Sequence, residues 1–165
     1  GRAPDPELVK EIESIMLEQK FIFGEHDLIV HDYGPGRIIA SAHAEVPSDA
    51  DIIEVHEVID LTEKIISKRL NVNMCIHMDP IVVNDERINH DREMMREVIK
   101  EYDEKFDFHD FRVVDGKQRT NFIFDLVIPH NYPKSKQQII KDLQAQITKK
   151  DKRAFLVITV EHSFT

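Results

Sequence analysis

The sequence predicts an α+β protein in which one helix–strand–strand–helix–strand unit occurs twice in tandem. The first observation is an internal repeat, because residues 26–65 can be laid over residues 109–147 with a His-Asp dipeptide at the start of both. The second is the order of helical and strand-like patterns, which is the same in both copies. The third is the alternation of apolar and polar residues in the strands, which lets helices cover one face of each sheet. We therefore expect two units, each a two-layer sandwich with both helices on the same sheet face.

Local signals place the elements of the first unit. A helix begins at the Asp5-Pro6 pair, since proline is favoured in the first turn of a helix. The sequence YGPG at residues 33–36 predicts a hairpin turn, because its glycines supply the backbone freedom that a tight turn needs. Ser48 or Asp49 is expected to cap the second helix. The elements are expected at about residues 6–19, 27–32, 37–46, 49–70 and 72–78.

The second unit repeats this order. The offset between the copies is 83 residues before the first turn and 82 after it, so that Val46-Pro47 falls on Ile128-Pro129. Helices and strands are expected at about residues 85–105, 109–114, 120–128, 134–149 and 154–161. The domains should therefore be residues 1–82 and 83–165, joined where Pro80 ends the last strand of the first copy.

Composition excludes several classes of protein. The formal net charge of −9 disfavours broad nucleic-acid binding, which needs clustered Lys and Arg. Cys75 is the only cysteine, so no intrachain disulfide can form and a reducing compartment is the simpler assumption. No apolar run is long enough to span a membrane, and no signal-peptide pattern is present. We expect a soluble chain, and its start without Met suggests a piece of a longer protein.

Strand alternation collects potential metal ligands on one face. His43, His77 and Asp79 should project from the sheet face away from the helices, and His26 starts the first strand at the same end of the sheet. His56 lies on the rim of the apolar face of the middle helix, where it can turn toward a sheet edge or a partner subunit. Neutral imidazole and carboxylate bind Zn, and similar sites accept Mn, Fe, Co or Ni. The alternative, ordinary surface histidines, stays open because the chain has no HExxH or paired CxxC motif.

Other chemistry finds little support. The His-Asp dipeptides are similar to those of metal-dependent phosphohydrolases, but in those enzymes the ligands lie on helices, whereas His26-Asp27 opens a strand. Cys75 is expected to be a packing or inert residue rather than a ligand. No nucleophile lies beside a general base, so we expect no enzyme and no catalytic residues.

Four segments in register resemble a known family. APDPELVKEIESIM, HDLIVHDYGPGRIIASAHAEV, VHEVID and IHMDP, within residues 3–82, are similar to the cytoplasmic C-terminal domain of the cation diffusion facilitator (cation efflux) transporters. The resemblance implies a metallochaperone-like, ferredoxin-like fold that forms a homodimer on the cytoplasmic side of the membrane. It also implies a preceding six-helix membrane domain in the full-length transporter.

The same resemblance implies a metal site. The family's metal-binding positions correspond to five residues of this chain, namely His26, His43, His56, His77 and Asp79. Zn is the first expectation for the bound ion, with Mn, Fe or Co as alternatives. The implied function is to sense cytosolic divalent metal and to favour the closed dimer, with no small-molecule substrate.

The second copy departs from the family pattern, which has one such domain. Asp125 replaces His43, Thr159 replaces His77, and Glu161 replaces Asp79. These oxygen ligands, with His109 or His162, would make a weaker site that suits Mn better than Zn. A role as a packing or dimer-extending module is the alternative.

Two other functions remain open at this point. The chain can be a structural scaffold that holds two transporter subunits together regardless of metal. It can also be a small-molecule-binding regulatory domain, since paired two-layer α/β units often serve that role. Apolar pockets between the copies would be the sign of the latter.

Overall fold

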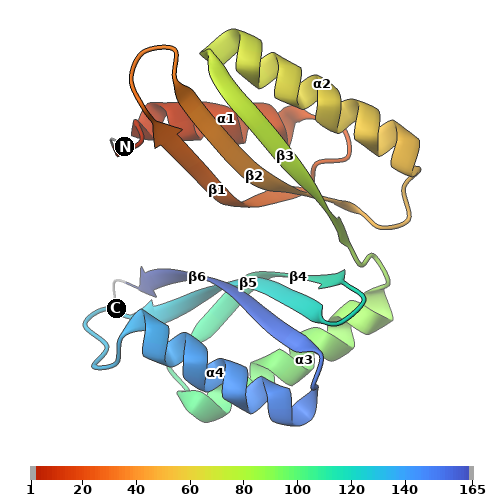
Figure 1. The fold of residues 1–165 in the computed structure, drawn as a ribbon. Coiled ribbons are helices and arrows are strands. Elements are labelled where there is room, and N and C mark those ends of the chain that lie inside the picture. The colour runs from red at the N-terminus through yellow and green to blue at the C-terminus, as the bar shows by residue number, and fades with distance from the viewer. Residues whose placement is uncertain (1–2, 164–165) are drawn as a thin grey trace. The chain divides into compact units, whose positions relative to one another are not determined.

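The chain folds as an α+β protein, as predicted. The computed structural model describes residues 3–163, and they divide into two compact units after Ile81, one residue before the expected boundary. The first unit consists of α1 (Pro6–Glu18), β1 (Gly24–Asp32), β2 (Ile38–Pro47), α2 (Ile52–Leu70) and β3 (Val72–Ile81) (Figure 1). The second consists of α3 (Asp85–Tyr102), β4 (Asp107–Asp115), β5 (Thr120–Pro129), α4 (Lys136–Lys150) and β6 (Ala154–Ser163). Both follow the predicted helix–strand–strand–helix–strand order.

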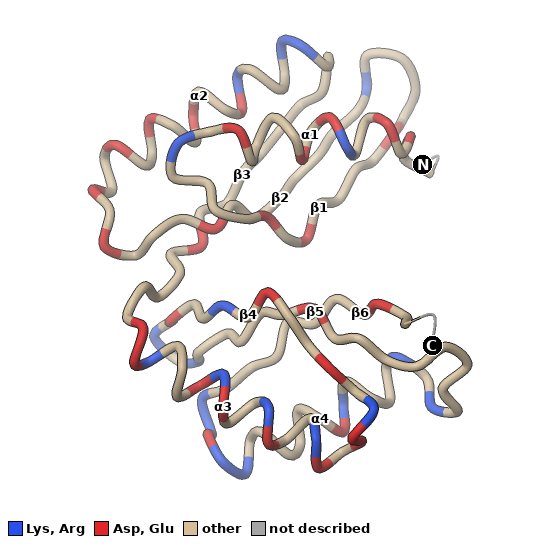
Figure 2. The backbone as a smooth tube through the Cα atoms, turned by 180° about the vertical axis from the view of Figure 1, so that it is seen from behind, with Lys and Arg blue, Asp and Glu red and all other residues tan. Residues whose placement is uncertain are grey.

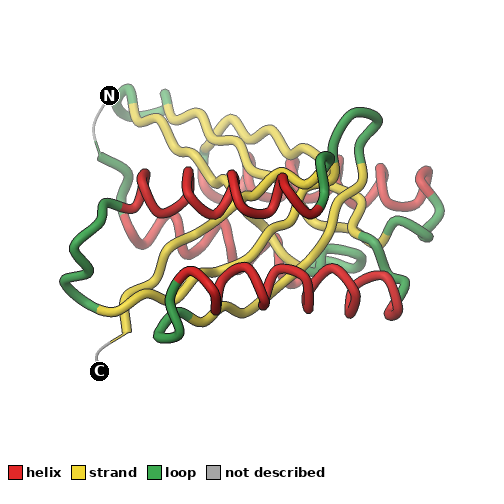
Figure 3. The backbone as a smooth tube through the Cα atoms, turned by 90° about the horizontal axis from the view of Figure 1, so that it is seen from below, coloured by secondary structure: helices red, strands yellow, loops and turns green. Residues whose placement is uncertain are grey.

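Each unit has two layers. In the first, β2 lies between β1, to which it is antiparallel, and β3, to which it is parallel. In the second, β5 lies in the same way between β4 and β6. The two helices of a unit cover one face of its strands (Figure 1), and Figure 3 shows α3 and α4 side by side on theirs. The opposite sheet face carries polar and apolar side chains together, with Ser41 and His43 beside Ile39 in β2 and Asp125 beside Ile123 in β5.

Two helix boundaries differ from the sequence prediction. The N-cap of α2 is Asp51, whose carboxylate accepts hydrogen bonds from the amides of Ile53 and Glu54, and not Ser48 or Asp49. The chain after β2 first makes a turn, in which the Ser48 amide donates to the carbonyl of Ile81, so the helix starts later. Helix α3 ends at Tyr102 rather than near residue 105. The segment after it turns back toward β4 at once, with the Phe106 amide donating to the Asp103 carbonyl.

Each unit has its own hydrophobic core between helices and strands. In the first, the inward side chains of β2 are small, and Ala40, Ala42 and Ala44 are buried against α1 residues such as Ile12 and Met16. In the second, the inward side chains are large and aromatic, and Phe106, Phe122 and Phe124 are fully buried. The strand alternation predicted which residues of β2 and β5 point into these cores.

Both units contain the same β-bulge. In the first, His26 pairs with His43 but Ile29 pairs with Ser41, so β1 has one extra residue between the pairs. In the second, the shift occurs between His109 and Arg112. The residue after each histidine, Asp27 or Asp110, has a left-handed backbone with φ of 53° or 56°. The shared irregularity shows that the repeat extends to backbone detail.

No helix within residues 3–163 is both long and apolar enough to cross a membrane.

Candidate metal centre

Three side chains from the three strands of the first unit converge on the sheet face away from the helices. His26 Nε2 lies 2.9 Å from Asp79 Oδ2, and His43 Nδ1 lies 3.1 Å from the same oxygen. One ligand atom from each of the three residues lies within 4.8 Å of the other two. Two imidazoles and a carboxylate therefore already surround one small volume.

Strand register explains this convergence. His26 of β1 lies directly across from His43 of β2, and their rings stack with centroids 4.9 Å apart. β3 runs parallel to β2, with His77 beside His43 and Asp79 two residues farther on, so both project to the same face. The bulge after His26 lets the residues on both sides of it keep their pairing with β2.

Glu45 is a fourth member of this cluster that the sequence prediction missed. Its carboxylate is buried, with 2% of the residue exposed, and its Oε2 lies 2.8 Å from His26 Nδ1. Strand alternation placed Glu45 on the same face as His43, but it gave no sign that this acid is covered. Gly24 lies across from it in β1, and a Cβ at that position would be 3.0 Å from Glu45 Oε1. The missing side chain of Gly24 thus provides room for the carboxylate.

The carboxylates set the protonation of His26. Burial by itself would lower the pKa of His26, but hydrogen bonds and charge from Asp79 and Glu45 outweigh it and raise the pKa to about 9. Burial would raise the pKa of Asp79, yet hydrogen bonds from His26 and His43 lower it. Without metal, His26 is therefore a cation at neutral pH, held between two carboxylates.

The donor set fits a divalent transition ion. His26 Nε2, His43 Nδ1 and Asp79 Oδ2 are nitrogen and oxygen ligands of the kinds that Zn binds, and three protein ligands leave room for another group. His26 would then donate its Nδ1–H to Glu45, the carboxylate–histidine arrangement that fixes the ring of a metal ligand. A proton on His26 Nε2 would occupy the place where a metal ion would bind, so the raised pKa of His26 means that proton and metal compete for this nitrogen.

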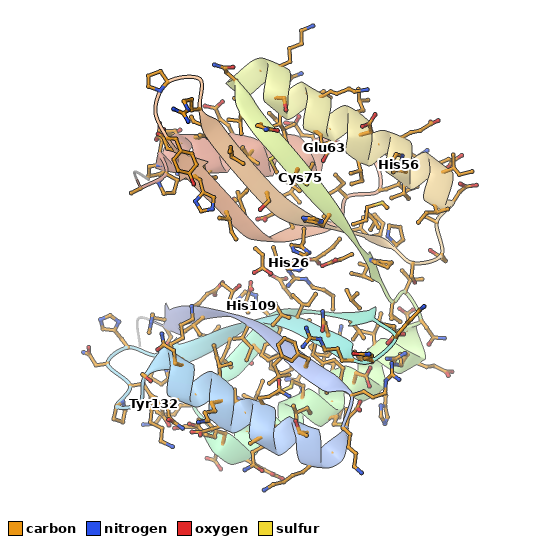
Figure 4. All side chains as sticks on the ribbon, viewed as in Figure 1. His26, His56, Glu63, Cys75, His109 and Tyr132 are labelled. Atoms are coloured by element: carbon orange, nitrogen blue, oxygen red, sulfur yellow. The ribbon has the colours of Figure 1, made fainter. Side chains whose placement is uncertain are left out.

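The two other predicted ligands lie differently. His77 is exposed beside the cluster, with its ring 5.2 Å from that of His43 and its Nε2 4.0 Å from Cys75 Sγ. Cys75 is also exposed. His56 is exposed on α2, on the helical layer, whereas His26 projects from the opposite face of the sheet (Figure 4). The fold thus brings together His26, His43 and Asp79, with His77 at the edge, and leaves His56 apart.

The family model for "Cation efflux protein, cytoplasmic domain" matches residues 4–81 of the chain. The first unit belongs to this family. The match ends at the residue where the first unit ends, so it covers the whole αββαβ fold described above. A comparison with curated proteins gives no match.

The excess negative charge lies entirely in the cation efflux unit. Residues 1–81 hold 16 acidic and 7 basic residues, whereas residues 82–165 hold 15 of each. Figure 2 shows this difference, with Lys and Arg more frequent along α3 and α4. The unit that carries the two-histidine cluster is therefore also the one whose field attracts cations.

The second unit has a related cluster at the equivalent positions. His109 Nε2 lies 2.9 Å from Glu161 Oε2, and His109 Nδ1 lies 3.1 Å from Asp110 Oδ2 and 3.6 Å from Asp125 Oδ2. The hydrogen bond to Glu161 raises the pKa of His109, and partial burial raises the pKa of Asp125. His162 is not part of this cluster, because its ring packs edge-on against His130 at 5.9 Å.

Proposed function

We propose that the cation efflux unit senses divalent metal on the cytoplasmic side of the membrane and thereby favours the closed homodimer of a transporter. The match of residues 4–81 to the family model for the cytoplasmic domain of cation efflux proteins supports this proposal. The transported ion would pass through the membrane domain of the full-length protein. The unit itself would bind metal without catalysing a reaction.

The observation that supports this proposal is that ring nitrogens of His26 and His43 both lie close to the same oxygen, Asp79 Oδ2. Two imidazoles, one from β1 and one from β2, lie against the same carboxylate oxygen of a residue in β3. Zn is the first expectation because two of the three donors are imidazoles, and Mn, Fe or Co are alternatives. Glu45 would orient His26, and His77 would supply a further imidazole at the exposed edge.

The negative charge of the first unit can couple metal binding to dimer closure. Two copies of this acidic unit repel each other when they approach, and bound cations reduce that repulsion. A metal ion can shift the equilibrium only if it binds the closed dimer more tightly than the open one. Ligands that become shared between facing protomers would provide this difference, and His56, exposed on α2, is available for such a contact.

Calorimetric titration of the chain with Zn²⁺ and Mn²⁺ tests metal binding. A His43→Ala/His77→Ala variant should lose the tight site of the wild type. A His90→Ala/His130→Ala variant is the matched control, since both residues are exposed in the second unit and lie outside the clusters. Equal and weak binding by the wild type and the His43/His77 variant would refute the sensing role.

A metal-independent scaffold is the second candidate. Several apolar residues of α2 are exposed, including Ile52 at 68%, Ile53 at 69% and Leu61 at 53%, and such residues are typical of protein–protein contacts when they lie close together. Sedimentation velocity with and without a chelator separates the two functions. A dimer whose sedimentation coefficient does not change on chelation would favour the scaffold.

A further inference from the structure

We propose that one end of the second unit binds the anionic lipid headgroups of the membrane that holds the transporter. Five exposed cations form this surface, which we call the basic end, namely Lys117, Arg119, Lys149, Lys152 and Arg153. The inference rests on the proposed location beside the membrane. It concerns a surface away from the metal centre, and it does not require metal.

Three segments of the second unit meet at the basic end. The turn between β4 and β5, the end of α4 and the start of β6 lie at the same end of the unit (Figure 1). The Thr120 amide donates to the Arg153 carbonyl, and Thr120 pairs with Ala154 in the sheet. The side chain of Gln144 on α4 donates to the Ala154 carbonyl. These contacts bring cations from two separate stretches of the sequence onto one surface.

The two arginines of the basic end are held in place. The guanidinium of Arg119 lies over the ring of Phe155, 4.0 Å from its centre, in a cation–π contact. The Nη2 group of Arg153 donates to the Gly116 carbonyl at 2.7 Å. A guanidinium has five N–H donors, so both side chains keep donors for phosphate oxygens. Because they are already positioned, binding costs them little side-chain entropy.

Cations outnumber acids at the basic end. Residues 115–119 and 149–153 together hold six basic and two acidic residues. Asp115 is already engaged by Arg87, which donates two hydrogen bonds of 2.8 and 3.0 Å to its carboxylate. Asp151 accepts a hydrogen bond from a backbone amide. Positive charge therefore remains available to a ligand at this surface.

The cations of the basic end are not consumed by salt bridges. Within residues 3–163, none of the five lies in a salt bridge with a carboxylate, although the charge of Arg153 acts on Asp115 at longer range. Two further acids, Asp85 and Glu86, lie in the first turn of α3. That helix packs on β4, whereas α4 packs on β6 at the opposite edge of the three strands. These acids therefore lie toward the other edge of the unit.

An anionic bilayer is the partner that fits this surface. The cytoplasmic leaflet has a negative surface potential, and each Lys or Arg near it raises partition onto the membrane about fivefold. Charges farther than about 10 Å from the surface are largely screened, so the local cations can bind although the chain has a net charge of −9. A membrane domain would also hold the unit close to the bilayer, which makes weak contacts effective. Nucleic acid offers the same phosphate chemistry, but the proposed location favours lipid.

Flotation of the full chain with lipid vesicles, in the presence of a chelator, tests the inference. The chain should bind vesicles of phosphatidylcholine and phosphatidylserine, but not vesicles of phosphatidylcholine alone, and added salt should release it. A Lys117→Gln/Lys149→Gln/Lys152→Gln variant should partition about 100-fold less. The matched control, Lys105→Gln/Lys136→Gln/Lys141→Gln, removes three exposed lysines before β4 and in the first half of α4, and should change partition by less than about threefold.

Three results would overturn the inference. They are no binding to the phosphatidylserine vesicles, equal losses in the test and control variants, and binding of a DNA duplex at least as tight as that of the vesicles. If the test variant does not fold, spin-labelled phosphatidylserine decides with the wild type. It should broaden the amide resonances of residues 117, 119 and 152, and broadening confined to other residues would also refute the proposal.

The metal-sensing proposal can fail separately. A chain that binds the phosphatidylserine vesicles but no Zn²⁺ would contradict sensing and support the basic end as a membrane contact. A chain that binds Zn²⁺ but not the vesicles would leave sensing intact and refute this inference.

Discussion

The buried carboxylate of Glu45 lies 2.8 Å from Nδ1 of His26, whose other ring nitrogen faces Asp79. This contact leaves only Nε2 of His26 available to a metal ion. The orientation of the most buried histidine in the cluster thus depends on an acid that would not itself bind the ion.

Replacing Glu45 should weaken metal binding without removing any ligand. Glu45→Gln keeps a hydrogen-bonding group, so we expect a moderate loss of Zn²⁺ affinity, and Glu45→Ala should lower it by about 10- to 100-fold. Competition with a chromophoric chelator measures both. Glu57→Gln, at an exposed position of α2, removes the same charge and should have little effect. Equal affinities for the Glu45→Ala and Glu57→Gln variants would show that Glu45 does not position His26.

The metal-free protein should lose stability as the pH rises. The pKa of His26 is about 9 in the folded chain, whereas the ordinary pKa of a histidine is 6.5, so the folded state retains a proton that the unfolded state has released between these values. The contribution of His26 to the free energy of unfolding should be largest below pH 6.5. It should fall by up to about 3 kcal/mol by pH 9. Urea unfolding with a chelator present measures the slope.

The His26→Gln variant is the control for that slope. It should show a smaller decrease in unfolding free energy over the same pH range, because the titrating group is gone. The pKa of His109 is also raised, but its side chain is nearly half exposed. Solvent screening therefore makes the contribution of His109 to the pH dependence of stability smaller. Identical pH profiles for the wild type and His26→Gln would contradict the assigned pKa.

His56 should affect closure more than binding. It lies apart from the His26, His43 and Asp79 cluster of its own unit, so His56→Ala should change the affinity for the first Zn²⁺ by less than about threefold. If His56 contacts metal across the dimer, the variant should lose the metal-dependent increase in sedimentation coefficient. A large loss of intrinsic affinity at protein concentrations where the chain is monomeric would instead place His56 in the first coordination shell.

The bulge residue should tolerate glycine better than a β-branched residue. Asp27 has a φ of 53°, a left-handed conformation that Asp and Asn adopt more readily than most residues. Asp27→Val should therefore cost about 1–2 kcal/mol of unfolding free energy, whereas Asp27→Gly should cost much less. Thermal unfolding of the two variants compares them directly, and an equal loss in both would mean that the backbone there is not constrained.

Much of the fold follows from patterns that are local in sequence. The repeat, the order of elements and the inward alanines of β2 could be predicted because apolar–polar alternation and turn residues can be recognised directly in the sequence. The cap of α2 could not, since Ser48, Asp49 and Asp51 are all capping residue types and only the structure shows that Ser48 instead donates its amide to the Ile81 carbonyl. The common face of His43 and Asp79 follows from strand alternation. The burial of Glu45 does not, because it depends on neighbouring strands and on the absence of a side chain at Gly24.

The matching bulges make the second unit a natural template for protein engineering. Since β4 already repeats the backbone of β1, a ligand set can be exchanged position by position without rebuilding the sheet. Asp125→His, Glu161→Asp and Val127→Glu would install the donor arrangement of the cation efflux unit in its neighbour, together with Asp107→Gly, because Asp107 faces Val127 as Gly24 faces Glu45. A duplicated scaffold of this kind lets metal preference diverge through side-chain replacement alone, while the inherited backbone remains as it was.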